Sequence, residues 1–401
     1  MKIAYIASDF GLVSETFVQD LAIGLAEAGQ TVKIFCNQAT ATRVDSLPLH
    51  VVRFLGVSSL LDRVGLRVDR LLGQQGEART YQRYLSHAHR QLRPALRQYQ
   101  PDVAYIDYGT VAALARSVLQ ELNIPFVVHF HGADITSALN NPAYRQALQQ
   151  VFQTASALIV ASDHVRRLLI LEGAPAAKIH VVRLGVNLSG LQPLPWSERK
   201  RLPPSIVFLG RLTPKKHPIA LLEAFALVKQ QVPDAHLSII GDGPELTRVQ
   251  QRISSLDLSD AVTLYGALPR AEALAIVNRH WVFAQHSVTA PSGDQEGFGI
   301  SLAEAAALEL PIVSTLHNGI PEQVVDGKTG FLVREFDYEA MADYLAKLLF
   351  NPDSAEMIGK AGREKICELC KSKQRVQQIK ELIQMKTVNE DPNSETATKK
   401  M

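Results

Sequence analysis

Short apolar runs alternate with longer stretches of helical periodicity along most of the chain. The first run, Lys2 to Ser8, precedes a helical stretch that Ser14 opens and Gly29 closes, and a second apolar run follows at Thr31 to Phe35. Runs of this kind predict buried strands, and the stretches between them predict connecting helices. The same alternation starts again after residue 204. The pattern therefore predicts two series of strand-helix-strand units around parallel sheets.

The remaining apolar runs complete each series. In the first they lie at residues 102–106, 126–130, 157–160 and 179–182, and in the second at 205–209, 236–240, 262–264, 281–283 and 311–313. We predict an α/β protein with one doubly wound, Rossmann-like domain over residues 1–190 and another over 205–370. Ligands in open α/β sheets bind beyond the carboxyl ends of the strands, so we expect the two domains to face each other across a cleft lined by those loops.

The segments between and after the domains differ in composition. Residues 191–204 are rich in proline and charge, which is typical of a linker. Helical periodicity predicts a C-terminal helix at residues 371–386. The polar residues 387–401 predict a disordered tail.

Composition narrows the class of protein. The chain has 401 residues, too many for one ordinary core, and its 46% apolar content, 20% charged content and net charge of +2 are typical of a soluble protein that does not bind nucleic acid. No stretch approaches the roughly 18 apolar residues that a membrane span needs. The start at Met1 to Ile6 predicts a strand and not a signal sequence, so we expect a cytoplasmic location.

Cys367 and Cys370 have the spacing of a redox or metal pair. No second cysteine pair or nearby histidine accompanies them, and the pattern around them is helical. We therefore expect neither redox nor zinc chemistry there, and no metal or cofactor elsewhere in the chain.

Glu296 and Glu304 stand eight residues apart where a glycine loop opens a helix. The backbone amides exposed there would belong to Phe298, Gly299 and Ile300. Such amides, backed by the positive end of a helix, can bind a diphosphate without a metal. Ionised carboxylates accept hydrogen bonds from vicinal hydroxyls, so Glu304 would bind ribose and Glu296 a transferred sugar.

A structural interpretation of the same segment stays open. Ser301 and Glu304 have the spacing of a capping box, in which Glu304 would only satisfy a free helix amide.

Two absences restrict the cofactor chemistry. The segment Gly241-Asp242-Gly243-Pro244 lacks the third glycine of the dinucleotide fingerprint, which argues against a nicotinamide cofactor. The chain contains no Asp-x-Asp pair, which argues against a metal-held nucleotide sugar. Basic side chains and amides would then neutralise the phosphates.

Several segments, in order and at matching spacing, resemble the retaining glycosyltransferases of family 4, which have the GT-B fold. They are Gly210 to Lys216, Gly241 to Pro244, Glu296 to Glu304, Ser314 to Glu322 and Asp326 to Leu332. Ser14 to Phe17, His131 to Asp134 and Ser287 to Asp294 look like the subgroup that builds bacterial exopolysaccharides, including the colanic-acid type. The resemblance covers residues 1–385.

The resemblance implies specific roles on the donor side. Arg211 and Lys216 would bind the donor diphosphate, because the leaving group gains negative charge as the glycosidic bond breaks. The loops at Gly210, Gly241 and Gly243, and the segment 298–301 with Ser301, would complete the donor site. Each position follows a predicted strand.

His131 follows the predicted strand 126–130, and the resemblance implies that it contacts the transferred sugar. Asp134 would orient that loop or cap the next helix. Gly11, Ser14 and Glu15 would lie on the acceptor side.

The sequence also departs from the family pattern. Gly11 stands alone where many members carry a glycine pair after the first strand, which puts the acceptor-side phosphate contact in question. Asn187 replaces a usual aspartate, and Glu309 replaces a usual glycine.

The resemblance implies a metal-independent, retaining hexosyltransferase that moves a sugar from a nucleoside diphosphate, UDP favoured, to a soluble or lipid-linked glycan. Departure and attack on one face of an oxocarbenium-like centre fits the absence of an evident carboxylate nucleophile. Two alternatives stay open, namely a noncatalytic nucleotide-sugar-binding partner and an epimerase or phosphorylase on the same fold.

Residues 61–100 carry excess positive charge. Eight arginines (63, 67, 70, 79, 83, 90, 93 and 97) outnumber Asp62, Asp69 and Glu77, giving 8 − 3 = +5. A basic helical face of this kind can rest on anionic lipid at the inner face of the cytoplasmic membrane, and it is also typical of a solvated surface.

Overall fold

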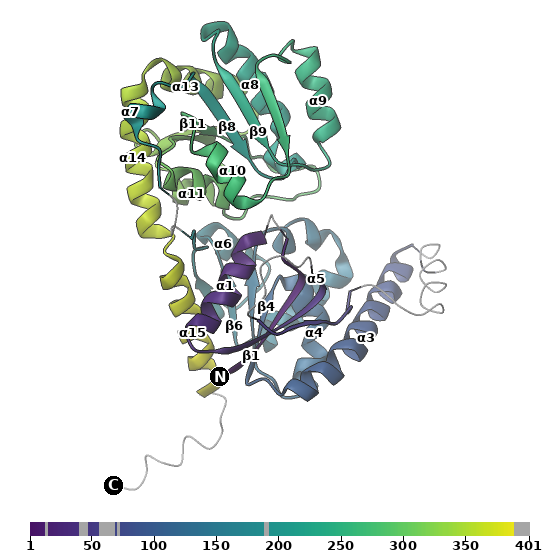
Figure 1. The fold of residues 1–401 in the computed structure, drawn as a ribbon. Helices are drawn as coiled ribbons and strands as arrows, with labels where there is room; N and C mark the ends of the chain where they lie inside the picture. Colours follow the sequence, from purple (N-terminus) through teal and green to yellow (C-terminus); the bar gives the residue numbers. More distant parts are fainter. Residues whose placement is uncertain (13–14, 40–46, 56–68, 70–72, 188–191, 389–401) are drawn as a thin grey trace. The chain divides into compact units, whose positions relative to one another are not determined.

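The computed structural model of the protein describes residues 1–12, 15–39, 47–55, 69, 73–187 and 192–388. The chain forms two compact units, one of Met1–Val182 with Lys373–Met401 and one of Arg183–Ser372. Each unit has a parallel sheet with helices packed on it (Figure 1). The prediction of two doubly wound, Rossmann-like units is confirmed.

Seven parallel strands form the sheet of the N-terminal unit, in the order β3-β2-β1-β4-β5-β6-β7. They are β1 (Lys2–Phe10), β2 (Thr31–Ala39), β3 (Leu49–Val51), β4 (Val103–Asp107), β5 (Phe126–Phe130), β6 (Ala157–Val160) and β7 (Ile179–Val181). Every residue of β4, β5 and β6 is buried. Parallel strands with helices on both faces need apolar residues on both faces, which explains the continuous apolar runs.

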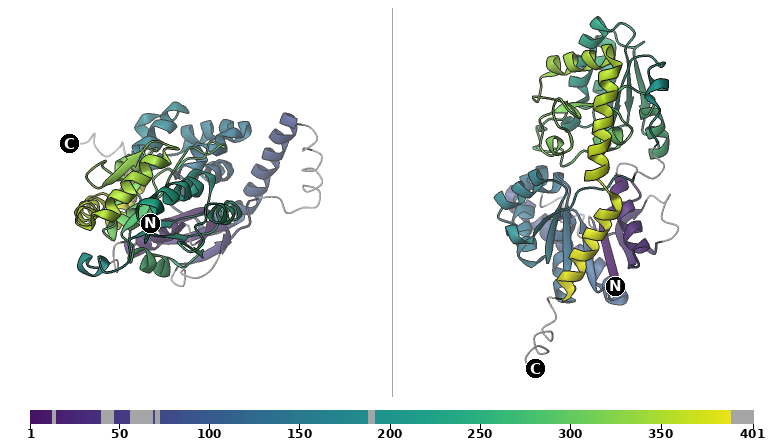
Figure 2. Two further views of the ribbon diagram at one scale, coloured as in Figure 1. Left: turned by 90° about the horizontal axis from the view of Figure 1, so that it is seen from above. Right: turned by 90° about the vertical axis from the view of Figure 1, so that its left-hand side faces the viewer.

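The helices of this unit form two groups. They are α1 (Thr16–Glu27), α3 (Gly73–Tyr99), α4 (Gly109–Glu121), α5 (Pro142–Thr154), α6 (Asp163–Leu171) and α15 (Ser372–Val388). Helices α3, α4 and α5 pack against one another in one layer. Helix α15 lies beside α1 (Figures 1 and 2), where Arg375 Nη1 donates to the carbonyl of Phe17 over 2.8 Å. The helix that we predicted as a separate C-terminal element is therefore part of the N-terminal unit.

Six parallel strands form the sheet of the C-terminal unit, in the order β10-β9-β8-β11-β12-β13. They are β8 (Ser205–Leu209), β9 (His236–Ile240), β10 (Val262–Gly266), β11 (Val282–Ala284), β12 (Ile312–Thr315) and β13 (Gly330–Val333). The helices are α7 (Trp196–Arg199), α8 (Pro218–Gln231), α9 (Leu246–Ser255), α10 (Arg270–Val277), α11 (Ile300–Ala307), α12 (Ile320–Gln323), α13 (Tyr338–Phe350) and α14 (Pro352–Leu369). Strands β3 and β13 were not among the predicted strands.

The segment predicted as a linker contains α7, and one face of this helix is buried in the C-terminal unit. Trp196 is 3% exposed and Arg199 is fully buried. Arg199 donates to the carbonyls of Leu308 and Glu309 at the end of α11, over 2.9 and 3.1 Å. A cation at a helix C-terminus satisfies carbonyls that lack intrahelical partners, so α7 is anchored to the core.

The loops after β8 and β9 meet at Gly241, which has a φ of +142°. A Cβ added there would stand 2.0 Å from the carbonyl oxygen of Gly210. We expect Gly241→Ala to lower the free energy of unfolding by about 3 kcal/mol or more, because both backbone strain and a clash oppose the methyl group. Urea denaturation measures this loss.

Gly327→Ala is the matched control, because Gly327 also has a positive φ (+71°) but no atom lies within 4 Å of an added Cβ. This substitution is expected to cost only about 1 kcal/mol. Equal losses in the two variants would show that the contact between the two loops contributes nothing.

Candidate functional site

The candidate donor residues of the C-terminal unit lie on loops that follow its strands. Gly210 to Lys216 follow β8, Gly241 and Gly243 follow β9, and residues 285–299 follow β11. Parallel strands end at the same edge of the sheet, so these loops share one edge.

Lys216 and Glu296 are brought together by this arrangement. Lys216 Nζ lies 3.1 Å from Glu296 Oε2, and each side chain is 12% exposed. Gln285 Oε1 accepts a hydrogen bond from the same ammonium group over 3.1 Å. The adjacent Lys215 pairs with Asp294 instead, at 3.3 Å. The two lysines therefore hold two acidic residues of one loop in place.

The charge state of Glu296 follows from this pairing. Burial alone raises the pKa of its carboxyl group, but the ammonium groups of Lys216 and Lys215 outweigh burial and lower that pKa to about 2. Glu296 is consequently ionised over the whole physiological pH range and can only accept hydrogen bonds.

Glu304 pairs with a cation that sequence analysis did not single out. Arg270 Nε donates to Glu304 Oε1 over 2.6 Å, and Glu304 is 6% exposed. The capping-box interpretation is not what the structure has, because the N-cap of α11 is Gly299, with a φ of +81° and no side-chain cap. The hydroxyl of Ser301 instead contacts Gln285 Oε1 at 3.4 Å.

The start of α11 is fixed from the neighbouring helix α12. Gln323 Nε2 donates to the carbonyl of Phe298, and Phe298 itself is 2% exposed. Ile300 opens the helix and Gly299 precedes it in a left-handed conformation that glycine adopts without strain. Of the two predicted cations, Lys216 is partly buried and Arg211 is exposed.

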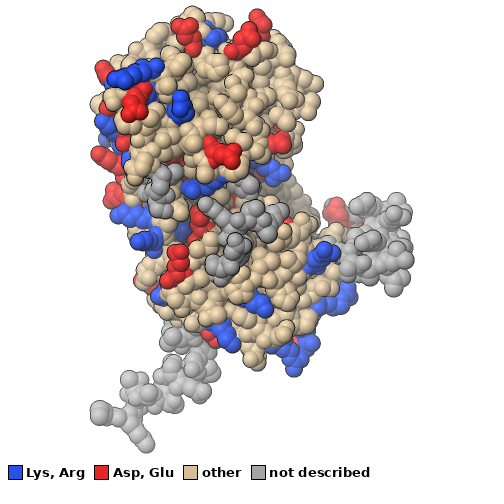
Figure 3. Space-filling view, in the orientation of Figure 1, with Lys and Arg blue, Asp and Glu red and all other residues tan. Residues whose placement is uncertain are grey.

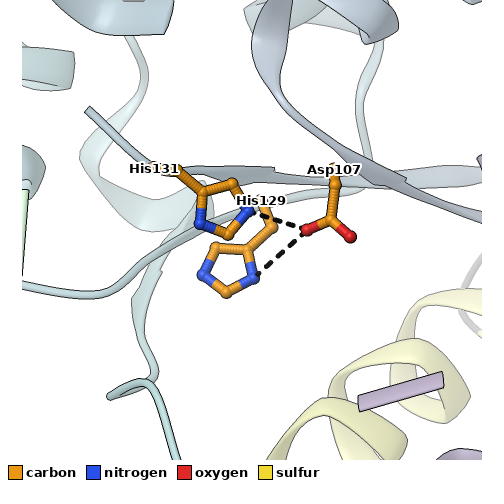
Figure 4. A group of neighbouring side chains, drawn as sticks. All are labelled: Asp107, His129 and His131. Atoms are coloured by element: carbon orange, nitrogen blue, oxygen red, sulfur yellow. Dashed lines mark hydrogen bonds and ion pairs between the residues drawn. The ribbon is translucent and has the colours of Figure 1, made fainter. Parts of the chain in front are cut away.

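His131 of the N-terminal unit lies in a buried polar cluster with Asp107 and His129 (Figure 4). His131 Nε2 donates to Asp107 Oδ1 over 2.7 Å, and the hydroxyl of Tyr5 donates to Asp107 Oδ2. Asp107 is fully buried, and the His131 side chain is 6% exposed. The buried Nδ1 of His131 has no hydrogen-bond partner among the described residues. An unpaired polar atom of this kind is rare in a folded core and is typical of a functional position.

Aromatic rings fix the orientation of the His131 imidazole. The rings of Phe17, Tyr108 and His129 lie 4.8, 4.7 and 4.3 Å from it, centroid to centroid. Tyr108 has a φ of +74°, and such strained residues cluster at functional sites. Burial lowers the pKa of His129, so this neighbour is neutral.

Asp107, His129 and His131 also offer the ligand types of a metal site, with one ligand atom from each within 4.8 Å of the others. His129 Nδ1 already lies 2.6 Å from the hydroxyl of Tyr105, and burial raises the pKa of Tyr105, so that hydroxyl keeps its proton. Hydrogen bonds thus occupy the atoms that a metal would need, and the cluster fits an orienting network better than a coordination sphere.

Two of the predicted acceptor-side residues, Asp134 and Glu15, lie beside this cluster. The Asp134 carboxylate accepts from the backbone amides of His131, Gly132 and Gly109, over 3.1, 2.9 and 2.9 Å. It thereby ties the loop after β5 to the first residue of α4. Gly11 follows β1 with a φ of +98°.

Glu15 precedes α1 and bonds to Tyr108, and burial raises the pKa of its carboxyl group. Ser14 lies outside the described residues.

Cys367 lies on α14 and Cys370 directly after it, and both are free thiols. Burial raises the pKa of Cys370 to about 12, so this sulfur is protonated and unreactive at neutral pH.

Asp107, Gln285 and Arg270 were not among the site residues predicted from the sequence. A signal existed for Asp107, because it directly follows the predicted strand 102–106 and therefore had to lie at the carboxyl edge of the sheet. Gln285 likewise follows the run 281–283. Arg270 had no such signal, since its partner Glu304 is 34 residues away on another helix.

Comparison with known families and proteins agrees with this geometry. Residues 196–365 match the family model "Glycosyl transferases group 1", and residues 14–185 match "Glycosyl transferase 4-like domain". The chain belongs to the family 4 glycosyltransferases. The resemblance described from the motifs is thereby confirmed.

Two relatives of this glycosyltransferase are named for the biosynthesis of bacterial exopolysaccharides. It is 34% identical over 272 residues to the putative colanic acid biosynthesis glycosyltransferase WcaL of Escherichia coli, covering 67% of this chain and 66% of that protein. It is 29% identical to the amylovoran biosynthesis glycosyltransferase AmsK of Erwinia amylovora, covering 87% and 90%.

Solved structures confirm the GT-B fold. Sucrose-phosphate synthase from Thermosynechococcus elongatus superposes with a TM-score of 0.77 at 18% identity, covering 97% of this chain and all of that one. Anabaena HepE, in complex with UDP and glucose, superposes with a TM-score of 0.75 at 19% identity, covering 96% and 99%.

Proposed function

We propose that this glycosyltransferase moves a hexose-type sugar from a nucleoside diphosphate to a glycan or lipid-linked glycan, with retention of the anomeric configuration and without a metal. The observation that carries the proposal is the ion pair between Lys216 and Glu296 at the carboxyl edge of the C-terminal sheet. The cation is available to a leaving diphosphate, and the ionised carboxylate is available to sugar hydroxyls.

Each residue then has a defined task. Lys216 and the exposed Arg211 neutralise the charge that develops on the diphosphate as the glycosidic bond breaks. Glu296 accepts hydrogen bonds from the sugar, and Glu304, whose carboxylate Arg270 holds, accepts from the ribose. The oxygen of the departing phosphate takes the proton of the acceptor hydroxyl on the same face of the sugar.

His131 contributes from the N-terminal unit. Its Nε2–H is bound to Asp107, so Nδ1 is left as an acceptor for a hydroxyl of the transferred sugar. Asp134 keeps the His131 loop in one conformation by accepting three backbone amides.

The relatives support a role in exopolysaccharide synthesis and leave two donor classes in contention. HepE was crystallised with UDP-glucose. A relative from Mycolicibacterium smegmatis, 32% identical over 245 residues, is a GDP-mannose-dependent mannosyltransferase. We favour a UDP-sugar and retain GDP-sugars as the direct competitor.

The test is the release of nucleoside diphosphate from a panel of UDP-, GDP- and ADP-sugars in EDTA, with and without a bacterial lipid extract. We expect release of nucleoside diphosphate from one donor class only, and only when the lipid extract is present. Loss of this release in Glu296→Ala would then establish the transferase and its donor. The anomeric configuration of the product, read by NMR, tests retention. Inversion would exclude the same-face route.

Two other functions predict different results in the same assay. A noncatalytic nucleotide-sugar-binding partner would bind a donor tightly and release no nucleotide under any condition. An epimerase would interconvert sugars without needing an acceptor.

We further propose that α3 docks this enzyme on anionic lipid at the inner face of the cytoplasmic membrane. Five arginines, at positions 79, 83, 90, 93 and 97, recur at spacings that place them within one stripe of the helix. Figure 3 shows Lys and Arg side chains on the surface where α3 lies. Arg93 and Arg83 pair with Glu121 and Asp69, which leaves the stripe less basic than a bare count indicates. The predicted arginines 63, 67 and 70 lie outside the described residues.

Binding of this kind would be peripheral, since none of the described helices combines the length and the apolar character that crossing a bilayer requires. We expect a triple variant, Arg79→Gln with Arg90→Gln and Arg97→Gln, to lose about 3 kcal/mol of binding to vesicles that contain anionic lipid, at about 1 kcal/mol per charge near the surface. Co-sedimentation at low and high salt measures this.

The control replaces Lys328, Lys347 and Lys360 with Gln, because these exposed residues of the C-terminal unit carry the same total charge. Equal loss of binding in both triple variants would show that net charge acts and that α3 does not dock.

A further inference from the structure

Residues 289–296, which we call the acidic loop, carry Glu296 and are fixed at both ends by one carboxylate and one imidazole. Glu335, which follows β13, accepts the backbone N–H of Thr289 on Oε2 over 2.9 Å. Its other oxygen, Oε1, lies 2.6 Å from Nδ1 of His317. His317 Nε2 in turn accepts the backbone N–H of Glu296 over 3.1 Å. Two side chains thus connect the first residue of the acidic loop to the last.

The hydrogen bonds around His317 define its tautomer. Nε2 faces two donors, the backbone N–H of Glu296 and the side-chain amide of Asn318 at 2.8 Å, so it must be the acceptor. Nδ1 faces a carboxylate and must carry the proton. The imidazole is therefore neutral, and Glu335 selects the tautomer that can accept from Glu296. The side chain of His317 is fully buried.

Asn318 reinforces the same arrangement. Its side-chain amide also donates to Gln295 Oε1 over 3.0 Å. Asn318 has a φ of +48°, a left-handed conformation that asparagine adopts more readily than most residues other than glycine.

Glu296 is consequently held from two directions. His317 fixes its backbone, and Lys216 fixes its carboxylate at 3.1 Å. A side chain whose backbone is free can keep its ion pair while its carboxylate moves relative to the bound sugar. Displacements of about 1 Å can cost roughly 100-fold in rate, so the backbone anchor matters for catalysis.

We propose that His317 and Glu335 are positioning residues that set the place of Glu296 through its backbone amide. They act on the transferred sugar through Glu296 and do not touch substrate themselves. This inference rests on the proposed role of Glu296, and the experiment below separates the failure of one from the failure of the other.

The test compares kcat, the donor KM and the affinity for nucleoside diphosphate in full-length wild type, His317→Ala, His317→Gln and Glu335→Gln. His317→Ala is expected to lower kcat by about 10- to 100-fold and to change nucleoside diphosphate affinity by less than about threefold, because the diphosphate is bound by cations elsewhere. Glutamine can both accept from Glu296 and donate to Glu335. The fall in log kcat caused by His317→Gln should therefore be at most half of the fall caused by His317→Ala.

Glu335→Gln is an isosteric test of the carboxylate. The side-chain NH2 of the new glutamine must face either the N–H of Thr289 or the Nδ1–H of His317. Both of these groups are donors and cannot accept from it. One of the two contacts is therefore lost, and we expect an intermediate fall in kcat.

A double-mutant cycle with Glu296→Gln separates positioning from general destabilisation. If His317 acts through Glu296, His317→Ala should lower kcat by less than about threefold in the Glu296→Gln background, because the effects of residues that act as a unit do not add. Additive losses would overturn the inference.

His280→Ala and His280→Gln are the matched controls. His280 is a buried histidine of the same unit whose ring nitrogens contact Ile276 O and Ser238 Oγ, each at 2.8 Å, before the start of β11. These variants should lose stability and keep kcat. Wild-type kcat in His317→Ala would reject the positioning role, and absence of any sugar transfer by wild type would reject the proposed function itself.

Discussion

Replacing Lys216 with Met is expected to lower kcat for sugar transfer by about 10²- to 10³-fold, the usual cost of removing one preorganised electrostatic contact to a developing charge. Methionine retains most of the length of the lysine side chain and removes only its charge and donors. Lys216 Nζ contacts both Glu296 and Gln285, so the variant removes the cation and frees two of its partners. Steady-state release of nucleoside diphosphate measures the loss.

The same variant is expected to change the dependence of stability on pH. In the wild type the pKa of Glu296 is about 2, below its ordinary value of 4.5. The ion pair therefore stabilises the fold fully above pH 4.5, and this contribution is lost as the pH falls toward 2. In Lys216→Met, burial raises the pKa of Glu296, and Lys215 is the remaining ammonium group that opposes this rise.

We expect Lys216→Met to be less stable than wild type by about 3 kcal/mol at pH 7, since it leaves a charge buried without its main partner. The deficit should shrink below pH 4.5, where protonation relieves the unpaired carboxylate of the variant. Urea denaturation at pH 7 and pH 3.5 tests this. Lys347→Met, at an exposed position of α13, is the control and should change neither kcat nor the pH dependence. If the loss of stability in Lys216→Met is the same at pH 7 and pH 3.5, Lys216 does not stabilise the fold by lowering the pKa of Glu296.

Most of the fold could be predicted from the sequence because parallel strands buried on both faces consist of continuous apolar residues. Strands β4, β5 and β6 are the clearest cases, since all of their residues are buried. Strand β13 was missed because its apolar residues lie within a glycine-containing segment that is typical of a loop. Strand β3 was missed because its three residues include His50 and none of them is fully buried, so they do not form a continuous apolar run.

The elements placed wrongly depended on contacts between distant residues. Proline and charge predicted a linker at 191–204, but composition does not show that the guanidinium of Arg199 binds the end of α11, more than 100 residues away. Helix α15 reaches the N-terminal unit through Arg375 and Phe17, which are 358 residues apart. No local pattern contains such a pairing.

One departure from the family pattern has a structural explanation. Glu309 occupies a position where the family usually has glycine, and its φ is +62°. A residue with a Cβ pays about 1 kcal/mol for that conformation. Its carbonyl accepts from Arg199 over 3.1 Å, which helps to hold the turn.

The candidate site was predictable residue by residue and not as a network. Glu296, Lys216 and His131 could be named because they follow strands within motifs. Their partners Asp107, His317 and Glu335 determine the charge states and tautomers, and these pairings arise only when strands are placed side by side. The charge states and tautomers of the candidate site residues can therefore be inferred only from the folded structure. Their positions along the chain can be predicted from the sequence.

Removing the Asp107 carboxylate is expected to have the second large effect. Asp107→Ala leaves the Nε2–H of His131 without its acceptor in a fully buried pocket, and it leaves the hydroxyl of Tyr5 with only the carbonyl of Val18, 3.2 Å away. Buried donors without partners cost about 1 to 3 kcal/mol each, so the free energy of unfolding should fall by about 3 kcal/mol. Without Asp107, either nitrogen of His131 can carry the proton.

Activity should fall further than stability alone accounts for. If Nδ1 of His131 must accept a sugar hydroxyl, the population of the wrong tautomer and the loss of orientation together are expected to lower kcat by about 10²-fold or more. Nitrogen-15 chemical shifts of the His131 imidazole report the tautomer directly, and the release of nucleoside diphosphate reports kcat in the same samples.

Asp107→Asn separates the hydrogen bonds from the charge. The asparagine oxygen can accept from His131 while its amide donates to Tyr5, whose hydroxyl also has the carbonyl of Val18 within 3.2 Å. We expect Asp107→Asn to keep most of the stability of the wild type. Its kcat should exceed that of Asp107→Ala, and the difference should follow the fraction of His131 that the spectra show in the Nε2–H tautomer. Asp102→Ala is the control, because Asp102 accepts the backbone N–H of Lys2 at the opposite end of β4. If Asp107→Ala folds and retains wild-type kcat, His131 does not act through a tautomer that Asp107 selects, and the unpaired Nδ1 needs another explanation.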